Sequence, residues 1–342
     1  MKYIINKSPI NTTNNFNIND LKIDLDLPNN LEFHDFKINK LDEFIYDTRI
    51  MNSFNSKIGL KFNKTYNLNI AIPNNIKDTI EFTYEFNNND TLIDSINIIF
   101  EENSSANIIF KYISNDNGNH FHHLNLKVLM NKYASGNISI INLLNNNSKN
   151  FVALENETKL NSTLTTNLID IGGNTKVNNI YANTKDKSTN KLNNIYIGTK
   201  NDIIDMTYFY KNNGIMSNNN IEVQGVLDDK AKKVFRGIID FQANNSESIG
   251  KENENCILLS GDCLSRSVPM LLCGEENVEG AHSVSSGKIE ENKLFYIMSR
   301  GFNKVEAQKL IINSNFNSIL NEIPNEELVK QLLDTIDEKI SI

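Results

Sequence analysis

The stretch 96–141 decides the fold class, because it contains INIIF at 96–100, NIIFK at 107–111, LNLKV at 124–128 and ISII at 138–141. In these runs apolar, often β-branched residues recur with a period of two. That pattern predicts β-strands, whose successive side chains point to opposite faces. Similar runs fill residues 66–241, mostly separated by Asn, Asp, Gly and Ser, and helical periodicity is nearly absent there.

Many short strands at near-regular spacing are compatible with a sandwich, a barrel or a solenoid. The length of this region and its Asn-rich turns favour the solenoid, in which stacked β-coils bury an inward stripe and expose polar corners. We therefore predict a mainly β protein with a β-solenoid core over residues 66–285. The preceding 1–65 form a short, partly helical N-terminal region, with one short helix over 41–51.

The pattern changes to helical after Gly287. Residues 290–300 place Leu294 and Ile297 on one face and predict a helix with Gly301 at its C′ position. A capping box of Asn303 and Glu306 predicts a second helix to about residue 312. Apolar spacing predicts a third helix over 325–339. Residues 286–342 are therefore expected to form a small helical C-terminal domain.

Composition and charge exclude several classes of function. The chain has 342 residues, a net charge of -8 and no basic stripe, which argues against a nucleic-acid partner. No signal-peptide core occupies 1–9, and no apolar stretch approaches 18 residues. We expect a cytoplasmic protein without a membrane partner.

Soft metal ligands are concentrated in one segment, which holds Cys256, Cys263, Cys273 and His282. Three clustered cysteines are atypical of a disulfide framework, so we expect reduced thiols, which are ligands suited to iron and sulfur chemistry. If the segment is strand-like, Cys263 and Cys273 lie about one coil apart and could stack. Burial of the cysteines as small apolar side chains explains them equally well.

A second group of ligand-type residues is His120, His122 and His123. In a strand, His120 and His122 would share a face and could share a metal. The favoured alternative is a solvent-facing turn that leads into the strand over 124–129.

Standard catalytic motifs are missing, since the sequence contains no P-loop, C-x-x-C, H-E-x-x-H or G-x-S-x-G. Any nucleotide hydrolysis must therefore come from a partner. One rival function is a β-solenoid binding or structural module, for example a glycan-binding one. Another is a polysaccharide lyase or hydrolase, but the adjacent Asp228 and Asp229 would point to opposite faces of a strand, which argues against a paired site.

Residues 279–301 closely resemble the signature of the SufB/SufD family, namely a histidine, a small-residue turn and then a helix that reads L-F-Y-x-x-x-R-G. Residues 227–239 are similar to a family segment that ends in F-R-G-x-I. The resemblance covers about residues 100–340. It implies a right-handed parallel β-helix and a non-catalytic scaffold subunit for iron-sulfur cluster assembly.

The resemblance also implies partners. The helical domain would dock a SufC-like ABC ATPase, and the end of the β-helix would bind a SufB/SufD-type subunit in a heterodimer or a homodimer. A sulfur donor would supply the assembly. The cofactor would be a transient iron-sulfur cluster or iron, and ATP-driven closure of the ATPase would twist the dimer and expose the site.

By this resemblance His282 matches a cluster-ligand histidine at the dimer interface. The cysteine of SufB proteins corresponds to a position near Glu254, so Cys256 is a ligand candidate displaced by one or two residues, and Cys263 and Cys273 are further candidates. SufB proteins place glutamates beside the histidine, where this chain has Ala281 and Ser283. That difference and the short N-terminus favour SufD or a short homologue.

Overall fold

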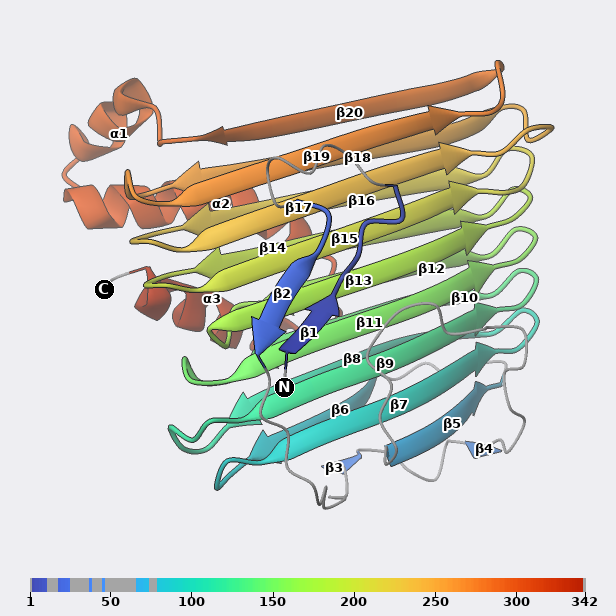
Figure 1. Cartoon of the computed structure of the whole chain (residues 1–342), viewed down its shortest axis with the longest axis horizontal. Helices are drawn as coiled ribbons and strands as arrows, with labels where there is room; N and C mark the ends of the chain where they lie inside the picture. Colours follow the sequence, from blue (N-terminus) through green and yellow to red (C-terminus); the bar gives the residue numbers. More distant parts are fainter. Residues whose placement is uncertain are drawn as a thin grey trace.

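The computed structural model describes residues 2–10, 18–24, 37–38, 45–46, 66–73 and 79–340. Two nine-stranded sheets form its core, and from β5 onward successive strands alternate between them (Figure 1). Neighbouring strands within each sheet pair in parallel from β5 and β6 to the end. The predicted parallel β-helix is therefore confirmed.

The two sheets are named here by the numbers of their strands. The even sheet contains β3 (Lys37–Ile38), β6 (Thr79–Phe86), β8 (Ser105–Ser114), β10 (Ser135–Leu143), β12 (Thr163–Asp170), β14 (Thr189–Gly198), β16 (Asn218–Leu227), β18 (Ser248–Leu258) and β20 (Val278–Gly287). The odd sheet contains β4 (Ile45–Tyr46), β5 (Tyr66–Ile72), β7 (Thr91–Phe100), β9 (Phe121–Met130), β11 (Lys149–Thr158), β13 (Thr175–Thr184), β15 (Ile203–Asn212), β17 (Lys232–Phe241) and β19 (Leu264–Cys273).

The core lies between the two sheets, where alternate residues of each strand point inward. Phe82 and Phe110, on neighbouring even strands, stack with ring centroids 4.9 Å apart. Leu168, Leu192 and Tyr208 are fully buried in the same core cluster. Burial of such an apolar stripe in every coil is the main stabilising term of a solenoid, because each coil contacts only its neighbours.

Repeated turns at one corner link odd strands to even strands. From the β7–β8 turn to the β17–β18 turn, each has a residue in the left-handed region, such as Tyr133 (φ 61), Asn161 (φ 54) and Lys187 (φ 53). A small buried residue follows, and in three turns its hydroxyl closes the turn. Ser162 Oγ donates to Lys159 O at 2.6 Å, Ser188 Oγ to Lys185 O at 2.7 Å, and Ser248 Oγ to Asn245 O at 2.9 Å. The polar corners expected of a solenoid are thus built from turns with their own hydrogen bonds.

The three helices are α1 (Glu291–Met298), α2 (Lys304–Leu320) and α3 (Glu326–Lys339). The capping box of Asn303 and Glu306 is present, and Asn325 caps α3. Gly301 (φ 101) lies two residues beyond the C-cap of α1, one residue later than predicted.

Helix α2 extends eight residues beyond the predicted end at residue 312. Its second half is rich in Asn and Ser, which are weak helix formers. Phe316 and Ile319 nevertheless bury against Ile169 and Ile195 on the outer face of the even sheet, where α3 packs as well. This tertiary burial explains why the helix continues.

The N-terminal strands β1 (Lys2–Ile5) and β2 (Leu21–Asp24) pair antiparallel and cross the outer face of the odd sheet (Figure 1). Ile5 packs there with Phe121 and Phe151. Most of the helix predicted over 41–51 lies outside the described residues, but within it Ile45–Tyr46 form β4 and pair with β5.

A buried ion pair fixes the N-terminal segment to this face. Arg236 binds Asp205 with both terminal nitrogens, at 2.7 and 3.0 Å, and its Nε donates to the carbonyl oxygen of Ile18. Asn6 donates to the same carboxylate at 2.6 Å. The arginine of the F-R-G segment therefore has a structural role in this chain.

Candidate functional site at the open end of the solenoid

The last coil of the β-helix is open to solvent. Strands β19 and β20 are the final strands of their sheets, and we call this pair the open end (Figure 1). Every residue of β20 except Val278 is exposed, and no residue of β19 is fully buried. Side chains that would point into the core in an earlier coil therefore face solvent here.

The register of β18 and β20 locates His282. Glu252 pairs with His282, Glu254 with Val284, and Cys256 with Ser286. Glu252, Glu254 and Cys256 are buried and alternate with more exposed residues, so they form the inward row of β18. Paired residues on neighbouring parallel strands share a face, so His282 continues this inward row beyond Glu252.

Glu254 is held by a complete set of donors. The ammonium group of Lys233 and the hydroxyl of Tyr196, at 3.1 Å, donate to Oε1, and Ser267 Oγ donates to Oε2 at 2.7 Å. Lys233 and Glu254 are both fully buried. A buried ion pair with this many hydrogen bonds is satisfied within the fold.

Glu252 differs from Glu254, although only two residues separate them. Its side chain is 2% exposed, and neither carboxylate oxygen has a hydrogen-bond partner among the described residues. Gly237 on the facing strand makes room for it, since a Cβ there would lie 2.2 Å from Oε1. Burial, followed by the nearby charge of Glu254, raises the pKa of Glu252 to about 8.

Glu252 was not among the site residues predicted from the sequence. The available signal was the alternation K-E-N-E-N-C at 251–256, which places two carboxylates and a thiol on one face of a strand. Local sequence does not specify which of them lies beside His282, because that depends on the register between strands 30 residues apart.

Cys256 is buried but lies four residues along β18 from the residue that pairs with His282. At about 3.3 Å per residue this offset amounts to roughly 13 Å along the strands. Burial raises the pKa of the Cys256 thiol despite the opposing charge of Lys233. This direction disfavours the thiolate, which is the metal-binding form of cysteine.

The suggestion that Cys263 and Cys273 stack is wrong. Cys263 precedes β19 and Cys273 ends it, so the two lie about 30 Å apart at a strand rise of about 3.3 Å per residue. Burial raises the pKa of Cys263, and all three cysteines are free. The structure therefore does not bring the four candidate residues together into one cluster.

The expectation of a solvent-facing histidine turn is also wrong, because His120, His122 and His123 are all buried. His120 Nε2 lies 2.8 Å from Asp116 Oδ1. His122 is held between Asn150, at 2.6 Å, and Asp94, at 3.2 Å. These separate partners give His120 and His122 independent structural roles.

Other polar groups in the core are paired in the same manner. Asp170 is fully buried and accepts hydrogen bonds from Asn142 at 2.6 Å, Asn178 at 2.8 Å and Asn150 at 3.4 Å. Burial raises the pKa of Asp170, and these amides and Lys176 oppose the rise. The Asn-rich composition thus partly reflects an internal amide ladder.

Asp228 and Asp229 lie in the turn after β16, not in a strand as assumed. Asp229 has a φ of 53° and accepts a hydrogen bond at 2.9 Å from the backbone N–H of Lys200 in the preceding coil. The expectation that the two residues point to opposite faces of a strand is therefore wrong.

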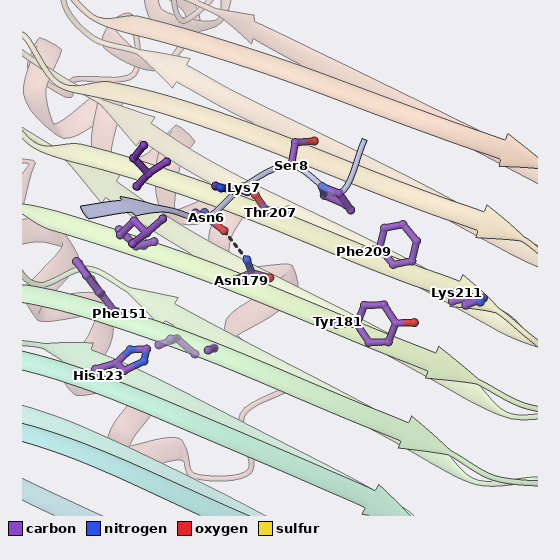
Figure 2. Close-up of a pocket in the computed structure, with 16 residues that line it drawn as sticks. Asn6, Lys7, Ser8, His123, Phe151, Asn179, Tyr181, Thr207, Phe209 and Lys211 are labelled. Carbon is purple, nitrogen blue, oxygen red and sulfur yellow. Dashed lines mark hydrogen bonds between the residues drawn. The ribbon is translucent and has the colours of Figure 1, made fainter. Parts of the chain in front are cut away.

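A separate cavity of about 560 Å³ lies between the N-terminal segment and the odd sheet. Figure 2 shows Asn6 directed at Asn179, with Tyr181 and Phe209 on neighbouring strands. The rings of Tyr181 and Phe209 stack 5.3 Å apart with an angle of 2° between them.

Within the part of the chain that the structure describes, no three His, Cys, Asp or Glu residues are grouped to hold a metal ion. The same residues include no helix long and apolar enough to cross a membrane.

Comparison with known proteins agrees with the fold and the signature. Residues 83–315 match the family described as SUF system FeS cluster assembly, SufBD core domain. The chain is 33% identical over 116 residues to iron-sulfur cluster assembly protein SufD of Bacillus subtilis, covering 34% of this chain and 26% of that protein. It is 25% identical over 141 residues to SufD of Escherichia coli, covering 41% and 33%.

A SufBD family protein of Pyrococcus horikoshii is 31% identical over 107 residues, which cover 31% of this chain and 24% of that protein. The matched parts thus span a third or less of the length of these relatives. The family match, in contrast, extends over more than half of this chain. The chain therefore belongs to the SufBD core family of the SUF system for iron-sulfur cluster assembly.

Proposed function

We propose that this chain is a cytoplasmic, non-catalytic scaffold subunit on which iron and sulfide are assembled into a cluster. The observation that carries the proposal is the open end, where His282 continues a buried row of polar residues but is itself exposed. Iron and sulfide are the substrates in this scheme. An exposed imidazole can bind iron when solvent or a second subunit brings it there.

The open end also favours a second subunit. Among the described strands, β19 and β20 each have a neighbour on one edge only, so their other edges carry unpaired backbone groups. Such edges are templates for pairing with another chain. A SufB/SufD-type subunit, either a second copy or a homologue, would cover this edge and enclose His282 in the interface.

The helices provide a separate docking surface. Helix α1 buries none of its residues, and Phe295 is 74% and Tyr296 60% exposed. Phe302, Val305 and Leu310, on the following loop and α2, are exposed as well. Several exposed apolar side chains on one group of helices favour binding of a protein partner. We propose that this partner is a SufC-like ABC ATPase.

Glycan binding is a weaker second candidate, favoured by the stacked Tyr181 and Phe209 beside the cavity. Aromatic faces of this kind bind sugar rings. The family assignment gives priority to the scaffold function.

Anaerobic co-purification with the cognate ABC ATPase, followed by reconstitution with iron and sulfide, tests the scaffold function. We expect a stable complex whose cluster absorption is lost in His282→Ala. Glu279→Gln, on the same strand but in an exposed ion pair with Lys251, is the matched control and should retain the cluster. Retention of the cluster in His282→Ala would place the ligand elsewhere, and absence of both complex and cluster in the wild type would refute the proposal.

A further inference from the structure

Glu252 is a buried carboxyl group whose two oxygens both lack a hydrogen-bond partner among the described residues. A buried carboxyl without hydrogen-bond partners destabilises a fold by several kcal/mol relative to a partnered one. The described residues provide no donor for it, whereas Glu254 has three. The sequence thus retains a carboxylate at a position where a glutamine or an apolar residue would serve the core at least as well.

The surroundings of Glu252 are shaped for its carboxylate. Gly237, on the facing strand β17, has no side chain, and this leaves room for the carboxyl group of Glu252. Pro269 pairs with Gly237 one coil further on and has no backbone N–H to donate. The closed sides of this space therefore accommodate the carboxyl group without providing it with a hydrogen-bond donor.

His282 lies beside Glu252 on the next strand of the even sheet. The two residues pair on adjacent parallel strands, so their Cα atoms lie about 4.8 Å apart and their side chains share a face. His282 is exposed, so the space beside its ring is accessible from the open end. A carboxylate and an imidazole at this separation can bind one ion with bonds of about 2.0–2.2 Å.

We propose that Glu252 and His282 together form a half-site for a ferrous ion. The inference rests on the proposed scaffold function and specifies its second ligand, which is a carboxylate and not the thiol of Cys256. Carboxylate and imidazole are the donors that ferrous iron takes in non-haem sites with open positions. Two protein ligands leave the other positions to water, sulfide or a second subunit.

This assignment separates iron binding from sulfur chemistry within one strand. Glu252 is in register with His282, whereas Cys256 is four residues further along β18. The ferrous ion therefore binds in the absence of sulfide and without a thiolate. Sulfide then binds at the coordination positions of the ion that Glu252 and His282 leave open.

Anaerobic titration of the full-length chain with Co²⁺, a spectroscopic substitute for Fe²⁺, tests the half-site. We expect visible absorption bands of bound Co²⁺ without a thiolate charge-transfer band. Glu252→Gln and His282→Ala should each weaken binding by about tenfold or more, since even residues that only orient metal ligands have effects of that size. Cys256→Ser and the surface control Glu279→Gln should bind Co²⁺ as the wild type does.

Glu252→Gln preserves the shape of the side chain, and its thermal unfolding transition shows whether the variant is folded. Wild-type affinity in folded Glu252→Gln, or loss of binding in Cys256→Ser, would overturn the half-site. Because the titration needs no partner or sulfide, it is independent of the scaffold test. Co²⁺ binding lost in Glu252→Gln while cluster assembly persists would refute the role of the half-site in assembly but not the scaffold function.

Discussion

Strands β11 and β20 have the same length and the same parallel pairing, but opposite environments. Eight of the ten residues of β11 are buried, whereas nine of the ten residues of β20 are exposed. The difference is the neighbours. β11 has a strand on both edges and Ile5 packed against Phe151 on its outer face, whereas β20 has a strand on one edge only. In a solenoid each coil is stabilised by the coils beside it, so an end coil is available for binding.

Two buried carboxylates of the middle coils, Asp170 and Asp205, differ from Glu252 near the end in their hydrogen-bond partners. In the middle coils Asp170 has three amide donors and Asp205 has a bidentate arginine. Near the end, Glu252 has none among the described residues. A fully partnered buried carboxylate stabilises a unique structure, whereas an unpartnered one leaves its oxygens available to a donor or an ion from outside.

The largest effect should come from removing a carboxylate in a middle coil. Asp205→Ala leaves Arg236 buried without its counter-ion, and we expect unfolding free energy to fall by about 3–5 kcal/mol. Glu279→Ala removes an exposed partner of Lys251 at the open end and should change stability by less than about 1 kcal/mol. Urea denaturation of both variants measures the contrast, and equal losses would show that the end coil is as tightly coupled as the middle.

A pH-dependent effect is expected where α3 meets the even sheet. Lys339 donates to the carbonyl oxygen of Ile171, and burial, followed by Lys176, lowers its pKa from 10.5 to about 7, although Asp202 and Asp170 oppose the shift. Between these pH values the unfolded chain binds the proton and the folded chain does not, so this group makes stability rise with pH.

Replacing Lys339 tests whether this group makes stability rise with pH. Lys339→Met should be more stable than the wild type at pH 7 and below, by on the order of a few kcal/mol, and the difference should disappear as pH approaches 10.5. Thermal unfolding across that pH range measures it. A difference that is independent of pH would contradict the lowered pKa.

Association through the open end should be sensitive to a single charge. Val284 pairs with Glu254 and is 36% exposed, so it is an apolar residue at the surface where we expect a partner. Val284→Lys should weaken association by about tenfold, equivalent to about 1.4 kcal/mol, and leave the monomer folded. Sedimentation of the chain alone and with its partner subunit measures this, and unchanged association would place the interface elsewhere.

The smallest effect concerns the turns that every coil shares. Lys187 is exposed in the left-handed region with a φ of 53°, a conformation that asparagine adopts more readily. Lys187→Asn should stabilise the fold by about 0.5 kcal/mol, since left-handed geometry destabilises most residues by about 1 kcal/mol. Lys185→Asn in the same turn, outside the left-handed region, should give no gain, and equal changes in both variants would indicate a charge effect instead.

The sequence predicted a strand or a helix correctly where the residues of that element alone determine the signal. The alternation in β7 to β10, the capping box of α2 and the Asn325 cap of α3 each depend on a few neighbouring residues. The end of α2 and the burial of His122 were missed, because they depend on the sheet that covers Phe316 and on Asp94 and Asn150 of neighbouring coils.

The sequence by itself determined the class of the fold, the helical C-terminal end and the family, and it predicted His282 as a ligand. Periodicity, capping signals and a long motif are all local properties, so they can be read along the chain. Tertiary structure alone decided that Glu252 and not Cys256 lies beside His282, and that the three cysteines are dispersed. Which residues become neighbours depends on the register between strands that are 30 residues apart in sequence. That register depends on how all the coils pack together, so it cannot be read from any single segment.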